Sequence, residues 1–120
     1  MRVYLHRRGM EMGYDLALEG RIRSVVDEWE NVSSKKMFGG VCFLMTGNMF
    51  CGVHRKDLIL RLGERQAAAA LPQKYIKPFD ITGRPMKGWV MVEPMGIGAH
   101  EALLKWLTMA RDFALTLPPK

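Results

Sequence analysis

The chain lacks the long apolar runs and the clustered reactive residues that would indicate its function directly. No run approaches the roughly 18 apolar residues of a membrane-spanning helix, so we expect no membrane association. Its two cysteines and three histidines do not show the paired short spacings of structural zinc sites. No pair of catalytic carboxylates stands out, and Gly96-Ile97-Gly98 lacks the third glycine and the preceding βαβ context of a phosphate-binding turn. We therefore expect a protein that is not an enzyme and needs no cofactor.

The first residues of the sequence do not show the pattern of a secretory leader. Residues 1–9, MRVYLHRRG, are basic and contain no apolar stretch of about 7 to 15 residues, so we expect a cytoplasmic protein. We predict that residues 1–12 form a disordered basic extension and that residues 13–120 form a single domain. Met10 and Met12 leave open a second interpretation, in which residues 1–9 precede the natural start of the domain.

The composition is that of one globular domain with a basic surface. A length of 120 residues fits a single core, and a hydrophobic fraction of 48% with 25% charged residues is ordinary for a folded protein. Eighteen lysines and arginines against twelve acidic residues give a net charge of +6. This charge makes an anionic partner plausible without identifying one.

Residue patterns predict an α+β fold, an antiparallel meander sheet of about five strands packed with N-terminal and C-terminal helices. Leu18, Ile22, Val25 and Trp29 recur at the spacing of one helical face, and Asp15 could cap that helix. Later helices are predicted at 64–71, where Pro72 ends the helix, and at 99–117. The last helix is predicted to carry an apolar stripe of Leu103, Leu107, Ala110, Ala114 and Leu117. A long ordered loop, 73–88, is expected to be anchored by Tyr75 and Phe79. Strands are predicted at 35–38, 41–46, 49–54, 57–62 and 89–92.

Two-residue connections join the first four strands. Gly39-Gly40 and Gly47-Asn48 can supply the positive φ angles of tight hairpins, whereas Arg55-Lys56 is a weaker turn. Gly39-Gly40 could instead form a bulge within one longer bent strand.

A regular register for these hairpins assigns residues to the two faces of the sheet. If Thr46 pairs with Met49, Leu44 faces Cys51 and Cys42 faces Val53. One face, predicted to be the core, then carries Cys42, Leu44, Cys51, Val53, Leu58 and Leu60. The other carries Phe43, Met45, Phe50 and Ile59, with His54, Asp57 and Arg61, and is either covered by a helix or partly open for a partner.

The same register addresses the chemistry of the cysteines. Cys42 and Cys51 would lie diagonally, about 7 to 8 Å apart, which is too far for a disulfide. His54 lies three residues beyond Cys51 and so on the opposite face of the strand, which disfavours a Cys-His dyad. We therefore predict that both cysteines are small buried core residues. His100 is predicted to be polar and exposed near the start of the last helix.

Four segments in order carry a family resemblance: MFGGVCF from Met37, GNMFCGV from Gly47, LILRL from Leu58 and GRPMKGWV from Gly83. Together they resemble the N-terminal domain of the TfoX/Sxy proteins, regulators associated with competence for DNA uptake. The resemblance covers roughly residues 12–118 and implies an antiparallel sheet packed against helices. Full regulators of this family carry a second, C-terminal helical domain with no counterpart in these 120 residues, so the resemblance implies the fold more firmly than the regulatory role.

Two binding functions follow as hypotheses. The first is a non-catalytic protein-interaction or regulatory domain that self-associates or docks on a partner, with adaptable apolar surface from its ten methionines. The alternative is a nucleic-acid-binding accessory protein, because basic side chains could contact phosphates and aromatic rings could stack on bases. The candidate contact residues come from three places. Phe43, Phe50 and Arg61 are predicted on the face opposite the core. Arg55 and Lys56 are at the hairpin tip, and Arg84 and Lys87 are on the long loop.

Overall fold

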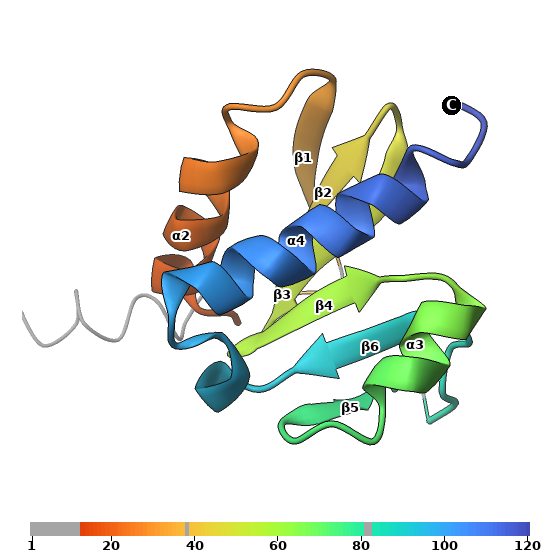
Figure 1. Cartoon of the computed structure of the whole chain (residues 1–120). Helices are drawn as coiled ribbons and strands as arrows, with labels where there is room; N and C mark the ends of the chain where they lie inside the picture. The colour runs from red at the N-terminus through yellow and green to blue at the C-terminus, as the bar shows by residue number, and fades with distance from the viewer. Residues whose placement is uncertain (1–12, 38, 81–82) are drawn as a thin grey trace, which may run out of the picture.

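The computed structural model describes residues 13–37, 39–80 and 83–120. The predicted basic extension, residues 1–12, lies outside the described residues. Three helices and six strands make up the described part, in an α+β arrangement that confirms the predicted fold class (Figure 1). The elements are α2 (Leu16–Val26), β1 (Val32–Met37), β2 (Gly40–Met45), β3 (Asn48–His54), β4 (Asp57–Arg61), α3 (Glu64–Ala70), β5 (Ile76–Pro78), β6 (Trp89–Val92), the 3-10 helix η1 (Pro94–Ile97) and α4 (His100–Ala114).

All neighbouring strands in the sheet are antiparallel, in the order β1-β2-β3-β4-β6-β5. The first four strands form the predicted meander. Strand β5, which is additional to the five predicted strands, was not predicted because its three residues lie inside the segment interpreted as a loop. It pairs with β6 at one edge, where Pro78 is tolerated because an edge strand has no second neighbour.

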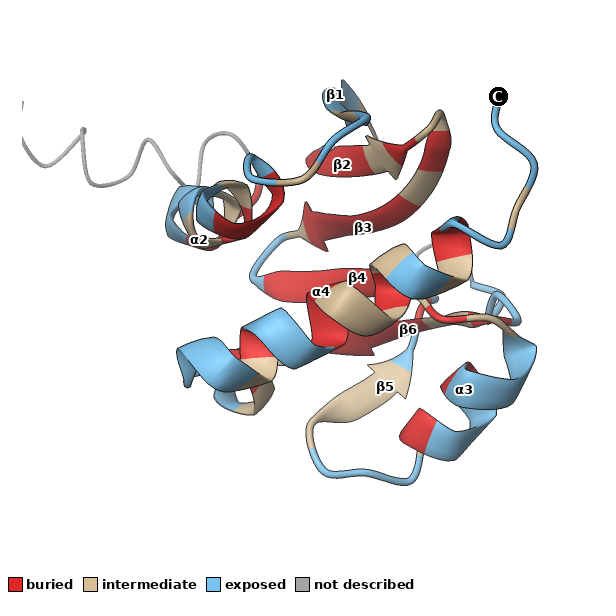
Figure 2. Ribbon diagram, turned by 45° about the horizontal axis from the view of Figure 1, so that its top comes forward, coloured by how far each residue is buried: buried red, intermediate tan, exposed pale blue. Residues whose placement is uncertain are grey.

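Helices α2 and α4 pack on one face of the sheet, which we call the helix face (Figure 1). We call the opposite face of the sheet the second face. Four residues of the stripe predicted for the last helix, Leu103, Leu107, Ala110 and Ala114, are fully buried there. The fifth, Leu117, lies beyond the end of α4 and is half-buried. Side chains of β2, β3, β4 and β6 complete this core. Figure 2 shows the contrast between these buried strands and the exposed edge strand β1.

The start of α2 confirms the predicted cap. The side chain of Asp15 accepts hydrogen bonds from the backbone N–H groups of Ala17 and Leu18, at 2.9 and 3.1 Å. These bonds satisfy donors that have no partner inside the helix. The helix ends at Val26, earlier than predicted, and the half-buried Trp29 packs beyond its end on Phe50, with 6.2 Å between ring centroids.

The hairpins follow the predicted plan with shifted turns. Met37 pairs with Gly40, so β1 and β2 are separate strands and the alternative of one bent strand is wrong. Met45 pairs with Asn48, which makes Thr46 and Gly47 the turn residues, with φ angles of 50° and 88°. Positive φ at both positions suits a type I′ turn. The Arg55-Lys56 turn is confirmed by the pairing of His54 with Asp57.

The predicted register between β2 and β3 is wrong. Phe43 pairs with Cys51 and Leu44 with Met49, so Phe50 is an extra residue that forms a β-bulge. The β2–β3 turn comes one residue earlier than predicted, at Thr46 and Gly47, and the bulge adds one residue to β3. Because strand side chains alternate with a period of two, these two changes alter which side chains share a face.

The changed register moves the two aromatic candidates into the core. Phe43, Met45 and Phe50 belong to the main buried cluster under the helices, with Phe43 and Phe50 only 1% and 0% exposed. Placing them on the second face was therefore wrong. Cys42 was also misplaced, since it pairs with Gly52 and lines a cavity on the second face with Ile59, while Cys51 belongs to the core cluster.

Candidate interaction surfaces

The second face of the sheet, opposite α2 and α4, has a small apolar cluster of its own. Ile59, Phe79 and Met91 are buried there, and Met49 and Trp89 pack against them. Phe79 comes from the long loop and stacks on Trp89, with ring centroids 5.5 Å apart. The prediction that Phe79 anchors this loop is thereby confirmed. Met86 on the same loop is 44% exposed, whereas Ile59 and Met91 beneath the loop are buried.

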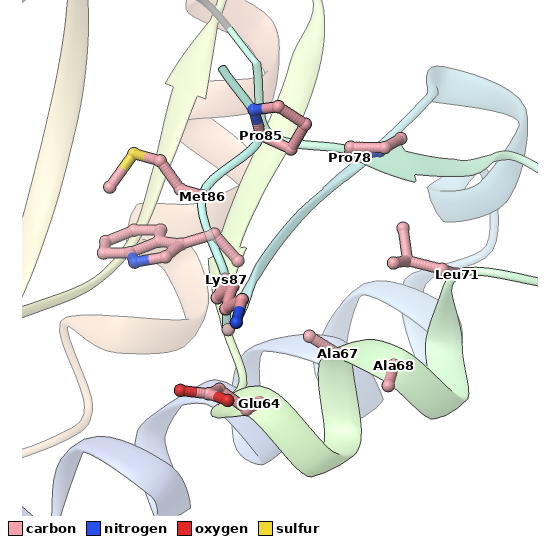
Figure 3. A pocket seen from close by; sticks show the side chains of 10 residues that line it. Glu64, Ala67, Ala68, Leu71, Pro78, Pro85, Met86 and Lys87 are labelled. Carbon is pink, nitrogen blue, oxygen red and sulfur yellow. The ribbon is translucent and has the colours of Figure 1, made fainter.

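A groove separates α3 from this loop (Figure 3); we call it the α3 groove. Its volume is about 320 Å³. Ala67 and Ala68 form the helix side, and Pro78 and Pro85 lie opposite, so that the walls are largely apolar. Its lining is completed by Glu64, Leu71, Met86, Lys87, Gly88 and Trp89.

The α3 groove has a charged end. Glu64 at the start of α3 and Lys87 on the loop lie toward the same end of the groove in Figure 3. The small side chains of Ala67 and Ala68 keep the middle open. The arrangement combines an apolar floor, which favours burial of apolar side chains, with one carboxylate and one ammonium group that can orient a polar partner.

A smaller, more enclosed hollow lies directly on the second face; we call it the second-face cavity. Its volume is about 170 Å³. Met86 and Trp89 line both this cavity and the α3 groove and so separate the two. The remaining lining residues are Met37, Gly40, Cys42, Met49, Val53, His54, Ile59 and Phe79.

Charged side chains gather at one end of the second face. Lys77 Nζ lies 3.1 Å from Asp57 Oδ2 and 3.6 Å from Glu93 Oε2. The hydrogen bond with Asp57 raises the pKa of Lys77, and burial lowers the pKa of His54, which pairs with Asp57 across the hairpin. Asp57 is buried, and its Oδ1 atom has no hydrogen-bond partner among the described residues.

The basic candidates do not form one patch. Arg55 and Lys56 are exposed at the β3–β4 turn, whereas Arg61 is at the other end of β4, roughly 13 Å along the strand. Arg84 and Lys87 are exposed on the long loop.

Two of these residues have structural contacts. The carbonyl oxygen of Arg55 accepts a hydrogen bond from the backbone N–H of Asp15, which ties the hairpin tip to the start of α2. The guanidinium of Arg61 lies over the rings of Trp89 and Phe113, at 5.4 and 5.8 Å from their centroids. Arg61 thus packs on two aromatic side chains at the end of β4 as well as presenting charge.

Both cysteines are free and buried, as predicted, but only Cys51 belongs to the core under the helices. Burial raises the pKa of each thiol, and that of Cys51 is held well above its ordinary value. A raised pKa keeps a thiol protonated and a poor nucleophile. His100 is exposed at the start of α4, as predicted. Within the described ranges, no three His, Cys, Asp or Glu side chains are grouped to hold a metal ion.

The α3 groove and the second-face cavity are the surfaces that the sequence analysis missed. Pro78, Pro85 and Trp89 mark the loop in the sequence, but the partner wall comes from α3, whose position depends on tertiary packing. The fold and surfaces define a small α+β domain with an apolar groove beside an antiparallel sheet. The chain matches the TfoX N-terminal domain over residues 24–114, and it belongs to that family.

The other comparisons add no relatives: neither the curated proteins nor the solved structures gave a match. None of the helices in the described ranges is both long and apolar enough to cross a membrane.

Proposed function

We propose that this domain is a non-catalytic interaction module that binds a protein partner through the α3 groove and has a regulatory role in the cytoplasm. The groove supports this most directly, because it is an exposed, largely apolar depression of about 320 Å³ with charged side chains at one end. Exposed apolar surface rimmed by polar groups is typical of protein interaction sites. A role in competence or transcription rests on the family alone.

The groove can be blocked from α3 with a matched control. Ala68 and Ala69 are neighbouring exposed alanines on α3, and only Ala68 lines the groove. Ala68→Glu places a charged, longer side chain in the apolar middle of the groove, whereas Ala69→Glu adds the same group elsewhere on the helix. We expect Ala68→Glu to weaken partner binding at least tenfold and Ala69→Glu to leave it near the wild-type level.

Affinity capture from the source cell, with and without nuclease, provides the measurement. Proteins that survive nuclease treatment, bind the wild type and Ala69→Glu and are lost with Ala68→Glu would support the proposal. Proteins captured equally by all three chains would contradict it, and circular dichroism would confirm that both variants are folded.

The second candidate is nucleic-acid binding through the long loop, favoured by the exposed Arg84 and Lys87 and the net charge of +6. Arg55 and Lys56 precede β4, whereas Arg84 and Lys87 lie on the loop that leads to Trp89, the partner of Arg61 at the other end of β4. The two pairs therefore do not form one surface, and the loop is the better candidate contact. Fluorescence anisotropy with labelled DNA and RNA would measure it. Phosphate contacts predict an affinity that falls steeply with salt and with the double change of Arg84 and Lys87 to glutamine. Nuclease-sensitive capture in the first experiment would point the same way.

A further inference from the structure

The second-face cavity is an unusual feature for so small a domain. It is a hollow of about 170 Å³ that opens to solvent on one side and is lined mostly by apolar side chains. An apolar hollow of this size can bind a small apolar molecule. We propose that the second-face cavity is a binding site for a small, uncharged molecule with a single aromatic ring.

The central strand β3 has a glycine between two of the residues that line the cavity. Gly52 lies in the middle of β3, between Cys42 on β2 and Ile59 on β4, so the central strand presents no side chain there. A Cβ atom added at Gly52 would lie 2.6 Å from the carbonyl oxygen of Val41 and 3.3 Å from the Met49 methyl carbon. The first distance is too short for a real contact, so a larger residue cannot fill this position without moving the backbone. The strand pairing therefore keeps this position between Cys42 and Ile59 without a side chain.

The size of the cavity limits the ligand to about one ring. An engineered protein cavity of about 150 Å³ lined by apolar side chains binds benzene, and the volume here is similar. A dinucleotide or a long acyl chain would not fit within it. A six-membered ring with one or two small substituents would.

The walls favour an aromatic ring over an aliphatic one. Three methionines, Met37, Met49 and Met86, contribute flexible thioethers, and sulfur atoms make favourable contacts with ring edges. Phe79 and Trp89 supply two tilted aromatic faces, at 42° to each other, against which a third ring can pack edge to face. Methionine flexibility also lets the walls adjust to a substituent.

The polarity of the walls excludes a charged ligand. The lining residues that the structure describes include no Asp, Glu, Lys or Arg, and the polar side-chain groups among them are the Cys42 thiol, the His54 ring and the indole N–H of Trp89. Because burial lowers the pKa of His54, that ring is neutral at neutral pH. A charged ligand would lose its hydration without gaining a partner. One hydroxyl or amine substituent could hydrogen-bond to His54.

Benzene titration of the full chain, with benzoate as the charged analogue, tests this assignment. With methyl-¹³C methionine, we expect benzene to cause saturable shifts of the Met37, Met49 and Met86 signals. Met95, 73% exposed on η1 and outside the cavity lining, should not respond. Benzoate should shift none of these signals. Absence of saturation with benzene, or equal shifts with benzoate, would overturn the proposal.

Variants of the two cysteines locate the binding. Cys42→Leu puts a larger side chain into the cavity and should abolish the shifts, while Cys51→Ala changes the thiol on the helix face and should preserve them. Persistent shifts in a folded Cys42→Leu protein would contradict the assignment.

A thiol measurement covers the case in which Cys42→Leu does not fold. In the Cys51→Ala protein, Cys42 is the remaining thiol, and benzene should slow its alkylation by at least threefold. An unchanged alkylation rate would overturn the proposal. So would methionine signals that shift with protein concentration alone, because a second copy of the chain would then fill the cavity.

Discussion

Replacing Phe50 with alanine tests the bulge and the face assignment that depends on it. Phe50 is the extra residue of β3 and has no pairing partner on β2. Its side chain is 0% exposed, in the core under the helices, and contacts Trp29 with 6.2 Å between ring centroids. If Phe50 instead faced outward as a stacking platform, its removal would cost little stability.

The expected cost follows from the burial. Truncating a fully buried phenylalanine to alanine removes its transfer free energy and leaves a void, and together these lower the free energy of unfolding by about 3 to 5 kcal/mol. Domains of this size are stable by only about 5 to 15 kcal/mol. Phe50→Ala should therefore remove about a fifth or more of the total stability.

Urea unfolding followed by circular dichroism at equilibrium measures this free energy. Met95→Ala is the control, because Met95 is 73% exposed and exposed substitutions usually change stability by less than about 0.5 kcal/mol. We expect a large shift of the urea midpoint for Phe50→Ala and none for Met95→Ala. A Phe50→Ala protein within about 0.5 kcal/mol of wild type would refute the placement of Phe50 in the core.

Two further predictions concern the charged end of the second face. Burial lowers the pKa of His54 in the folded protein below its ordinary value of 6.5. As the pH falls, the unfolded chain therefore binds a proton at His54 before the folded protein does. The free energy of unfolding should decline from about pH 6.5 down to the pKa of His54 in the folded protein. His54→Gln should flatten this decline in thermal melts, while the exposed His100→Gln should not; parallel curves for all three proteins would contradict it. Lys77→Met leaves the buried Asp57 without its cation and should cost about 1 to 3 kcal/mol in urea unfolding, whereas Lys56→Met at the exposed turn should cost little. Equal losses would contradict a stabilising ion pair.

Local sequence patterns were sufficient for most elements of the fold. The helix stripe of Leu103, Leu107 and Ala110, the cap at Asp15 and the Trp89–Val92 strand each depend on neighbouring residues, and the structure confirms them. Strand β5 was missed because three residues around a proline carry too little pattern to distinguish a strand from a loop.

The register could not be predicted in the same way, because a bulge has no distinctive local pattern. Strand β2 has apolar side chains at successive positions, so either of its faces could belong to the core. Phe43 and Cys42 are each acceptable in a core, so the pattern fits the regular pairing and the bulged pairing equally well. The choice depends on packing across the sheet. Phe43 and Phe50 are large enough to fill the space beneath α2 and α4, whereas Cys42 is small enough to fit under the loop on the second face.

The position of Arg61 shows how a residue chosen for its charge can act through its neighbours. Its guanidinium lies 5.4 Å from the centroid of the Trp89 ring, and Trp89 separates the α3 groove from the second-face cavity. Cation–π contact favours one orientation of that ring. Loss of the guanidinium would free Trp89 to move and so alter the shared wall of both sites. Arg61 therefore supports the apolar surfaces, and its contact with a partner stays a prediction.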